Sequence, residues 1–424
     1  MRNKIITTRD WTQWLSDRRD AGLTRRLRVA DSPQDVLMQV DGRALLTFCS
    51  NDYLGLAHHP EIAVAMQEGI ARWGVGAGAA HLVNGHFSPH DQLEHALADW
   101  LQVERALLFS TGYMANLAVV GGLMGRGDTV IADRLNHASL VDAAQLSGAK
   151  LLRYRHTDVA DARRQLERAS GTRMILTDGV FSMDGDVAPL AALMSLAEEF
   201  DAWLVVDDAH GFGVWGEAGR GSLSALGLVS SGVPAYLIQV GTLGKAFGTA
   251  GAFVAGAAQP IEVLLQRARS YLFTTAQPPA LACATLGSLD LVRTGDARRA
   301  NLMARVSQFR SELERIGVPQ GGGLAAEPMS SPLVQDPHSL ALMPSMTPIQ
   351  PIWVGDSLRA LVLAQRLEQR GILVPAIRPP TVPVGSARLR VTLSAGHSSE
   401  QVMQLVSALQ TSLSQDVLDG HHGA

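Results

Sequence analysis

Residues 242–248 read TLGKAFG, which places Lys245 in a turn of small residues just after an apolar run. An earlier apolar run, residues 203–206, leads into DDAHGFG (207–213), so Asp207 and His210 are expected at the tip of a buried strand. A lysine amine can form a Schiff base with an aldehyde, and a carboxylate can keep a pyridine nitrogen protonated so that the ring accepts electrons. Together, the three residues predict a site for pyridoxal 5'-phosphate.

Strand-sized apolar runs alternate with helical patterns from about residue 51 to residue 291. The expected strands are 106–109, 129–132, 151–154, 174–177, 203–206, 236–240 and 252–255. Apolar strands separated by helices are typical of a largely parallel sheet with helices on both faces. The prediction is an α/β fold with a large domain at 51–291, preceded by an N-terminal segment at 1–50.

The remaining residues, 292–424, predict a smaller α+β domain. A long helix at 296–316 is followed by a stretch rich in Gly, Pro, Ser and Met, residues 317–347, which we expect to be exposed and without regular structure. Two capping boxes are expected, Ser88 with Asp91 before one helix and Ser398 with Gln401 before the last helix.

Other polar residues follow expected strands and join the list of candidates, because ligands in α/β sheets bind outside the carboxyl ends of strands. Gly112 and Tyr113 open a helix whose backbone N–H groups could hold a phosphate, although a plain helix start is the alternative. His137 follows the next strand and could stack on a pyridine ring. Ser182 lies in TDGVFSMDGD (177–186), which in isolation indicates only a turn.

Composition excludes several classes of protein. A net charge of −4 gives no reason to expect nucleic acid or an anionic membrane as a partner. We expect no signal peptide, no membrane span, no disulfide framework from two cysteines, and a cytoplasmic location. The pair His58–His59 lacks further ligands at metal-binding spacing, so no metal is expected. GVGAG (74–78) follows a helical pattern and therefore does not predict a dinucleotide site.

Together these residues resemble the fold-type-I pyridoxal-phosphate enzymes and, within them, the α-oxoamine synthase family. The similarity extends from SNDYLGL (50–56) to RLRVTLSAGH (388–397). The segment AIRPPTVPVGSARLR (376–390) resembles members that join L-alanine to a pimeloyl thioester rather than glycine to a short acyl-CoA. The chain departs from the usual family pattern at Asp178, where a Glu is common, and at Ala80 and His81.

The resemblance implies a role for each candidate and a homodimer whose sites form between subunits. Lys245 would bind the cofactor and later move the substrate α-proton, Asp207 would pair with the ring nitrogen, His210 would bond the ring oxygen and His137 would stack on the ring. The remaining cofactor contacts would be Gly112, Tyr113, Ser182 and Thr242, with Thr275 from a neighbouring subunit. Arg390 would hold the amino-acid carboxylate near Asn51, and Arg25 and Thr381 would face the acyl substrate, carried on CoA or a carrier protein.

Three other functions are compatible with parts of this pattern. A sister acyltransferase would use glycine with a short acyl-CoA. A non-catalytic protein that kept the fold would be expected to have lost Lys245 or Asp207, and both are present. An aminotransferase would turn alanine into a keto acid without releasing CO2, and the second arginine expected of one is not evident.

Overall fold

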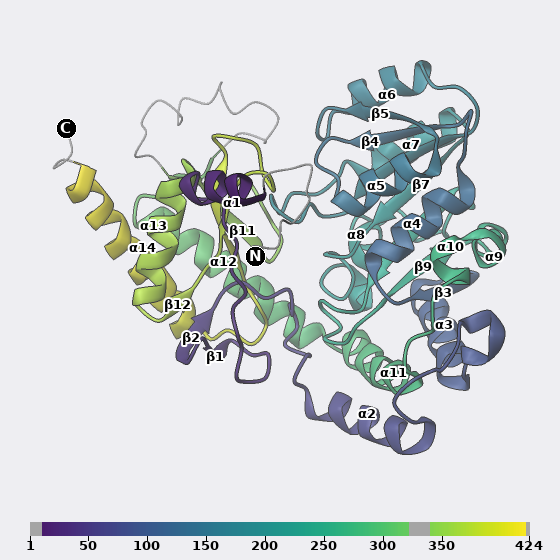
Figure 1. The fold of residues 1–424 in the computed structure, drawn as a ribbon, viewed down its shortest axis with the longest axis horizontal. Coiled ribbons are helices and arrows are strands. Elements are labelled where there is room, and N and C mark those ends of the chain that lie inside the picture. The colour runs from purple at the N-terminus through teal and green to yellow at the C-terminus, as the bar shows by residue number, and fades with distance from the viewer. Residues whose placement is uncertain (1–10, 322–339, 421–424) are drawn as a thin grey trace, which may run out of the picture.

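A computed structural model describes residues 11–321 and 340–420, with side chains up to residue 415. A seven-stranded sheet forms the centre of the larger part of the molecule (Figure 1). Its strands, in spatial order, are β3 (Arg105–Phe109), β9 (Ala252–Gly256), β8 (Leu237–Thr242), β7 (Ala202–Asp207), β6 (Arg173–Asp178), β4 (Thr129–Asp133) and β5 (Lys150–Tyr154). Only β9 runs antiparallel to its neighbours. The predicted α/β fold with a largely parallel sheet is confirmed.

Helices cover both faces of this sheet. One face packs on α4 (Gly112–Leu123), α5 (Ala138–Ser147), α9 (Ala258–Arg267) and α10 (Arg269–Leu272). The other packs on α6 (Val159–Glu167), α7 (Leu190–Glu199) and α8 (Gly221–Ala225). Further helices around the sheet are α2 (Pro60–Trp73), η1 (His81–Gly85), α3 (Ser88–Leu101), η2 (Glu217–Gly219) and α11 (Pro279–Arg293). Because both faces are buried, the central parts of these strands are largely apolar, whereas the edge strand β5 (KLLRY) is partly exposed.

The smaller part of the molecule contains two short sheets. One has the order β10 (Ala341–Leu342), β11 (Ile349–Gly355), β14 (Ala387–Thr392), β13 (Ala376–Ile377), and it packs with α12 (Asp296–Arg315), α13 (Ser357–Gln369) and α14 (Ser399–Gly420). The other pairs β1 (Leu37–Val40) and β2 (Arg43–Thr47) with β12 (Ile372–Leu373). Part of the N-terminal segment therefore shares a sheet with the C-terminal residues. The domain boundaries at residues 50 and 291 stay predictions.

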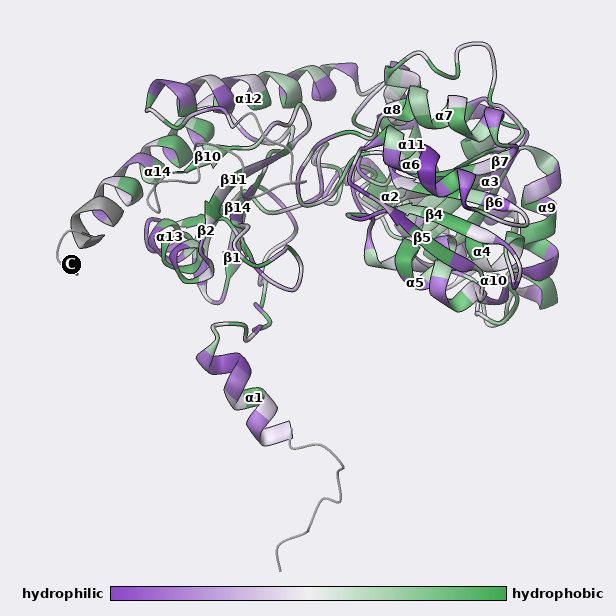
Figure 2. Ribbon diagram, turned by 90° about the horizontal axis from the view of Figure 1, so that it is seen from above, coloured by the Kyte–Doolittle hydropathy of each residue, from purple (hydrophilic) through white to green (hydrophobic). Residues whose placement is uncertain are grey.

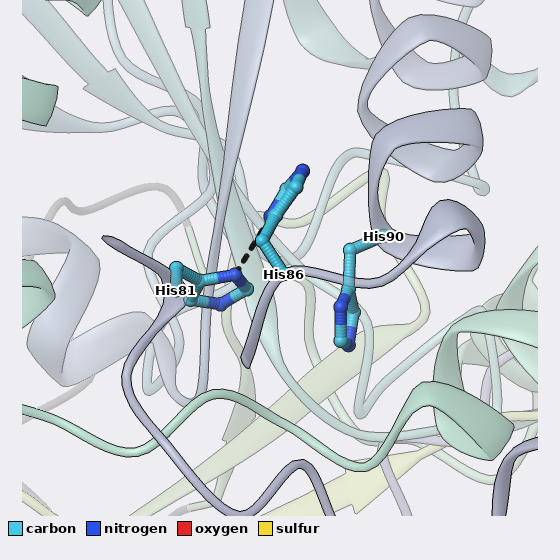
Figure 3. Close-up of side chains that lie close together, drawn as sticks. All are labelled: His81, His86 and His90. Carbon is cyan, nitrogen blue, oxygen red and sulfur yellow. Dashed lines mark hydrogen bonds between the residues drawn. The ribbon is translucent and has the colours of Figure 1, made fainter. Parts of the chain in front are cut away.

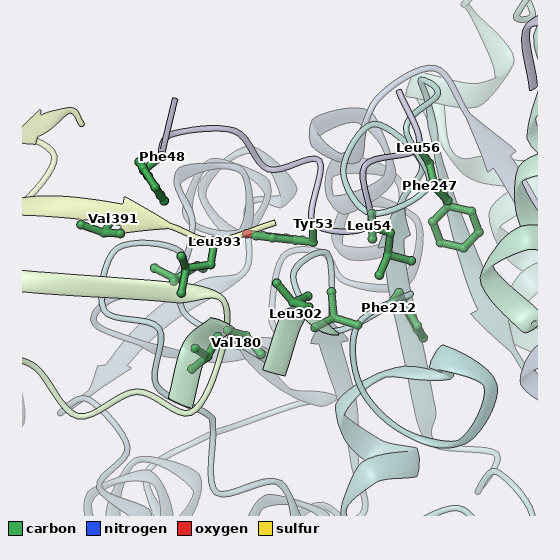
Figure 4. Packing of buried hydrophobic residues seen from close by; sticks show 14 of the residues in the cluster. Phe48, Tyr53, Leu54, Leu56, Val180, Phe212, Phe247, Leu302, Val391 and Leu393 are labelled. Carbon is green, nitrogen blue, oxygen red and sulfur yellow. The ribbon is translucent and has the colours of Figure 1, made fainter. Parts of the chain in front are cut away.

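The segment SNDYLGL lies where the two parts meet (Figure 4). Tyr53, Leu54 and Leu56 are fully buried in a cluster that also contains Phe247, from the turn that carries Lys245, and Leu393, just after β14. Burying aromatic and leucine side chains is strongly favourable. Apolar packing therefore holds the Lys245 turn against residues from both ends of the chain.

Two local predictions need correction. The helix α3 begins one residue early, with Phe87 as its N-cap, so the third helical residue is His90 and not Asp91. The His90 Nδ1 accepts the Phe87 N–H at 3.0 Å, and the Phe87 ring packs edge-on against Trp73. The predicted Ser88–Asp91 box is therefore wrong, whereas the Ser398–Gln401 box is confirmed.

The second correction concerns the stretch 317–347, of which 322–339 lie outside the described residues. Residues 340–347 are not an exposed loop: they include β10, and Ser345 and Thr347 are buried. At the other end of the chain, α1 (Trp11–Asp20) buries no residue and stands away from both parts in Figure 2. None of the described helices combines the length and apolar character of a membrane span.

Candidate active site

Four neighbouring strands bring the main candidates to one edge of the large sheet. In the spatial order β8, β7, β6, β4, the carboxyl ends of these strands lead to Lys245, Asp207, Asp178 and His137. Asp178 and Asp207 occupy matching positions on adjacent strands. A cavity of about 200 Å³ opens at this edge. Its lining comprises Gly112, Tyr113, Asn116, His137, Ser139, Asp178, Asp207, Ala209, His210, Val240, Gly241, Thr242 and Lys245.

The Lys245 amine lies against His210 and the cavity. Its Nζ is 2.9 Å from the His210 Nε2. Desolvation lowers the pKa of Lys245 to about 8, although Asp207 and Asp178 nearby favour the charged form. Roughly a tenth of the amine is therefore neutral at pH 7, far more than for an ordinary lysine, and the neutral amine is the form that attacks an aldehyde.

His210 is itself held by a buried hydroxyl. The Tyr53 hydroxyl is 2.6 Å from the His210 Nδ1, so the two imidazole nitrogens contact Tyr53 and Lys245. Burial and the neighbouring cation Lys245 lower the pKa of His210 well below its usual range. The neutral imidazole can thus offer one donor and one acceptor to these partners.

Asp207 is buried among neutral donors. Its Oδ2 accepts a hydrogen bond from the Asn116 amide at 2.7 Å and its Oδ1 accepts the Ala209 N–H at 3.2 Å. It forms no ion pair with any residue in the described ranges. The Asn116 Oδ1 is buried and likewise has no hydrogen-bond partner there. A buried carboxylate with only neutral partners is costly, and a cationic ring nitrogen would offset that cost.

Asp178 connects the sheet to His137. Its Oδ2 accepts the His137 backbone N–H at 2.9 Å, and the His137 Nδ1 is 2.7 Å from the Ser139 hydroxyl. Burial and the neighbouring Asp207 raise the pKa of Asp178 well above its usual range. Asp178, whose side chain is one methylene shorter than that of Glu, therefore fixes the loop that carries His137.

The start of α4 forms another wall of the cavity. Thr111 caps this helix by accepting the Met114 N–H at 3.2 Å, and Gly112 and Tyr113 follow in the first turn. First-turn N–H groups have no partner within a helix and favour anions. The Thr242 side chain is the nearest neighbour that a Cβ at Gly112 would meet, at 4.0 Å. The geometry leaves room for a phosphate beside this turn.

A second group of candidates surrounds Arg390 on β14. The Arg390 Nε donates to the Ser182 carbonyl at 2.6 Å, Nη1 to the Thr392 hydroxyl at 2.9 Å and Nη2 to the Asn51 side chain at 3.2 Å. These bonds use three of the five guanidinium N–H groups, and the Tyr53 hydroxyl also interacts with the guanidinium. A guanidinium held in this way can bind a carboxylate. Because Tyr53 contacts both Asn51 and His210, this group adjoins Lys245.

Three predicted residues lie apart from both groups. Arg25, Thr381 and Thr275 are exposed, and none of them lines the cavity of this chain. Thr275 pairs through its backbone with Ala80 on the outer surface. Ser182 is held at Arg390 through its carbonyl and also lies outside the cavity lining.

Asn116 and Ser139 were not predicted as site residues from the sequence, and Asp178 was noted only as a departure from the family pattern. Asp178 directly follows a predicted strand, so the strand-end rule that found Asp207 applies to it equally. Asn116 is the one amide in the apolar helix GYMANLAVVGGL, which was an available signal.

The cavity fits pyridoxal phosphate. It presents a buried amine for the aldehyde, a buried carboxylate without a cation for the ring nitrogen, and a helix start for the phosphate. These are the groups that the protein must supply to such a cofactor.

A separate cluster of three histidines lies beside α3 (Figure 3). His81, His86 and His90 have ring nitrogens within 4.8 Å of one another, close enough to hold a metal ion. The His81 and His86 Nδ1 atoms are 2.8 Å apart, so they share a proton. Both nitrogens of His90 are bonded to backbone, at Phe87 and Gln277. A metal ion at this cluster would have to displace those bonds.

Residues 43–409 match the family described as aminotransferase class I and II. The 8-amino-7-oxononanoate synthase of Pseudomonas fluorescens is 55% identical over 93% of this chain and 94% of its own length. The enzyme of the same name from Stutzerimonas stutzeri is 54% identical over 95% of this chain and 96% of its own.

Solved structures agree with these relatives. The serine palmitoyltransferase of Sphingomonas wittichii superposes with a TM-score of 0.85 at 28% identity, covering 96% of this chain and 98% of that one. The 8-amino-7-oxononanoate synthase of Francisella tularensis has a TM-score of 0.72 at 29% identity, covering 88% and 99%. A similar structure of SPT contains a pyridoxal phosphate internal aldimine. The chain belongs to the class I and II aminotransferase family and, within it, to the 8-amino-7-oxononanoate synthases.

Proposed function

We propose that this chain joins L-alanine to a pimeloyl thioester, carried on CoA or a carrier protein, and releases CO2 and the thiol to give 8-amino-7-oxononanoate for biotin synthesis. Relatives that share more than half of its residues over nearly its whole length have this activity in their name. The observation that carries the proposal is the Lys245 amine, with a pKa near 8, beside a cavity that also holds the buried Asp207. It is the arrangement that a pyridoxal-phosphate enzyme needs.

When bound, the cofactor supplies an aldehyde that condenses with amines and a ring that accepts the electron pair left on the substrate carbon. Lys245 would hold the aldehyde, Asp207 the ring nitrogen and His210 the ring oxygen. His137 would cover the ring face. Gly112, Tyr113 and Thr242 would hold the phosphate, with Ser182 nearby and Thr275 contributed by a second subunit.

Arg390 is proposed to position the amino acid. Its guanidinium would bind the alanine carboxylate, and Asn51 keeps the guanidinium in place. The neutral Lys245 Nζ, once free, can take the proton from the alanine Cα and later return a proton to the product. His210 lies 2.9 Å from that nitrogen and orients it.

The acyl substrate is proposed to enter past Arg25 and Thr381. Desolvation and, to a smaller extent, the charge of Arg25 lower the pKa of Arg378, so the two cations lie near each other. The Thr381 backbone N–H donates to the Arg378 carbonyl at 3.1 Å. Two arginines beside an exposed turn would attract an anionic thioester.

A homodimer is proposed to complete the site. The Ala276 N–H donates to the Ala79 carbonyl at 2.9 Å, beside the Ala80–Thr275 bridge. The flanking side chains Val83 and Phe273 are 77% and 71% exposed. Apolar side chains gathered at such a surface are typical of subunit contacts. A second copy that covered this surface would also bury Thr275.

The test compares two substrate pairs on the purified holoenzyme. Alanine with pimeloyl-CoA should give a product with the mass of 8-amino-7-oxononanoate and one CO2 for each thiol released. Glycine with acetyl-CoA serves as the matched comparison and should react far more slowly. Faster turnover of the glycine pair would indicate a sister acyltransferase, and keto acid from alanine without CO2 would indicate an aminotransferase.

A further inference from the structure

The loop between β6 and α7, residues 179–189, connects the two parts of the molecule. It begins after Asp178, which holds the His137 backbone, and it carries the Ser182 carbonyl, which accepts the Arg390 Nε at 2.6 Å. Asp178 at the end of β6 and the loop that follows it therefore contact both the residue proposed to cover the cofactor ring and the residue proposed to hold the substrate carboxylate. The position of this loop therefore affects how far His137 lies from Arg390.

The loop is tied to the large sheet by a buried histidine. His156, just after β5, lies with its Nδ1 at 2.9 Å from the Asp133 Oδ1 and its Nε2 at 2.7 Å from the Asp186 Oδ2. Its side chain is 3% exposed. Desolvation lowers the pKa of His156, but the bonds to Asp133 and Asp186 outweigh it and raise the pKa to about 10. The imidazolium thus bridges two carboxylates, and the Phe181 ring packs edge-on against it at 4.4 Å.

The same loop is tied to the smaller part of the molecule. Asp184 forms a buried ion pair with Arg388 on β14, two residues before Arg390. The Gly185 carbonyl accepts hydrogen bonds from the Ser345 hydroxyl at 2.8 Å and the Thr347 hydroxyl at 3.1 Å. Gly185 has φ 71°, and a Cβ there would lie 2.4 Å from the Ile349 carbonyl oxygen. The loop is therefore fixed from both sides with little room to shift.

We infer that His156 is a positioning residue for amino-acid binding, because through Asp186 it fixes the loop whose Ser182 carbonyl orients Arg390. The inference rests on the proposed role of Arg390 as the carboxylate clamp. His156 touches neither cavity nor clamp, so its influence must pass through the loop. Small displacements of a binding group can cost about 10- to 100-fold in its function.

The main test replaces Asp186 by Asn in the holoenzyme, which keeps the side-chain size and removes one charge from the bridge. The KM for L-alanine should rise about tenfold or more, while the KM for pimeloyl-CoA and the cofactor affinity stay within about twofold. Preference for L-alanine over L-alaninamide should fall, since the clamp is misplaced. His156→Gln should act in the same direction more strongly, because it leaves both carboxylates without the imidazolium between them.

The controls separate this inference from the function on which it rests. Arg390→Gln should abolish the preference for L-alanine over L-alaninamide, and if it does not, the clamp itself is wrong. If Arg390→Gln has that effect but Asp186→Asn and His156→Gln leave it unchanged, only the positioning role is wrong. His95→Gln, at an exposed histidine paired with Asp91, should change nothing. Failure of both bridge variants to fold would show that the bridge serves stability alone and would overturn the inference.

Discussion

Asp207 is a buried carboxylate whose hydrogen-bond partners are all neutral. It receives one hydrogen bond from Asn116 and one from a backbone N–H, and it makes no ion pair within the described ranges. Asp207→Asn should lower kcat by about 100-fold or more, because a preorganised charge in a dry site contributes about that much. The control is Asp208→Asn, which removes a carboxylate from the next residue after the same strand. A kcat within a factor of a few of the parent for Asp207→Asn would contradict the assignment.

The lowered pKa of Lys245 predicts how the rate of cofactor uptake depends on pH. Its folded pKa is about 8, below the usual 10.5, because the surrounding protein disfavours the charged amine. The neutral amine therefore becomes available as the pH rises through about 8, and the cost of this lysine to folding, complete below that pH, is lost as the pH rises toward 10.5. Uptake of pyridoxal phosphate by the apoprotein should accelerate between pH 7 and pH 9 and then level off. A rate that still climbed tenfold per pH unit above pH 9 would show an ordinary lysine.

At the scale of elements, the turn that carries Lys245 depends on one close backbone approach. Gly248 has φ 66°, and a Cβ there would lie 2.3 Å from the Ala57 nitrogen in the chain that follows SNDYLGL. Gly248→Ala should reduce the free energy of unfolding by about 1–3 kcal/mol from strain alone, and displace Lys245. Thermal unfolding of the apoprotein measures this loss. Gly76→Ala, where a Cβ meets nothing within 4 Å and φ is not positive, is the control, and equal melting temperatures for the two variants would refute the argument.

Elements also show how far sequence patterns reach. The seven strands were predicted within a residue or two because each is a short apolar run between helical patterns. The start of α3 was misplaced because Ser88 and Phe87 compete as N-cap, and Phe87 gains from packing on Trp73. Residues 340–347 were misjudged because Ser345 and Thr347 are polar, yet they bury their hydroxyls against the Gly185 carbonyl. Contacts between distant segments decided both cases.

For the whole molecule, the strand-end rule explains which site residues could be predicted. Lys245, Asp207 and His137 follow neighbouring parallel strands, so local sequence sufficed to group them. The approach of Arg390 to Ser182 depends on how the two parts of the molecule pack and has no local signal. The same holds for the bridge made by His156, because His156, Asp133 and Asp186 come from three separate segments of the chain.

The proposed dimer is tested at this scale. Phe273→Asp combined with Val83→Asp should convert the dimer into monomers and remove activity, because charges at a subunit contact oppose association and Thr275 would no longer reach the second site. Light scattering gives the mass, and Leu226→Asp, at a 49% exposed leucine on α8's end, is the control. A double variant that stayed dimeric and active would place the subunit contact elsewhere.

One amine, Lys245, is proposed to hold the cofactor. The sequence contains only two other lysines, Lys4 and Lys150, so a labelled lysine can be identified without ambiguity. Borohydride reduction of the holoenzyme, followed by peptide mass measurement, should place one pyridoxyl phosphate on Lys245 and leave Lys150 unmodified. A label on Lys150 or Lys4, or an unmodified Lys245 in a protein that had retained the cofactor, would show that Lys245 is not the residue that binds it.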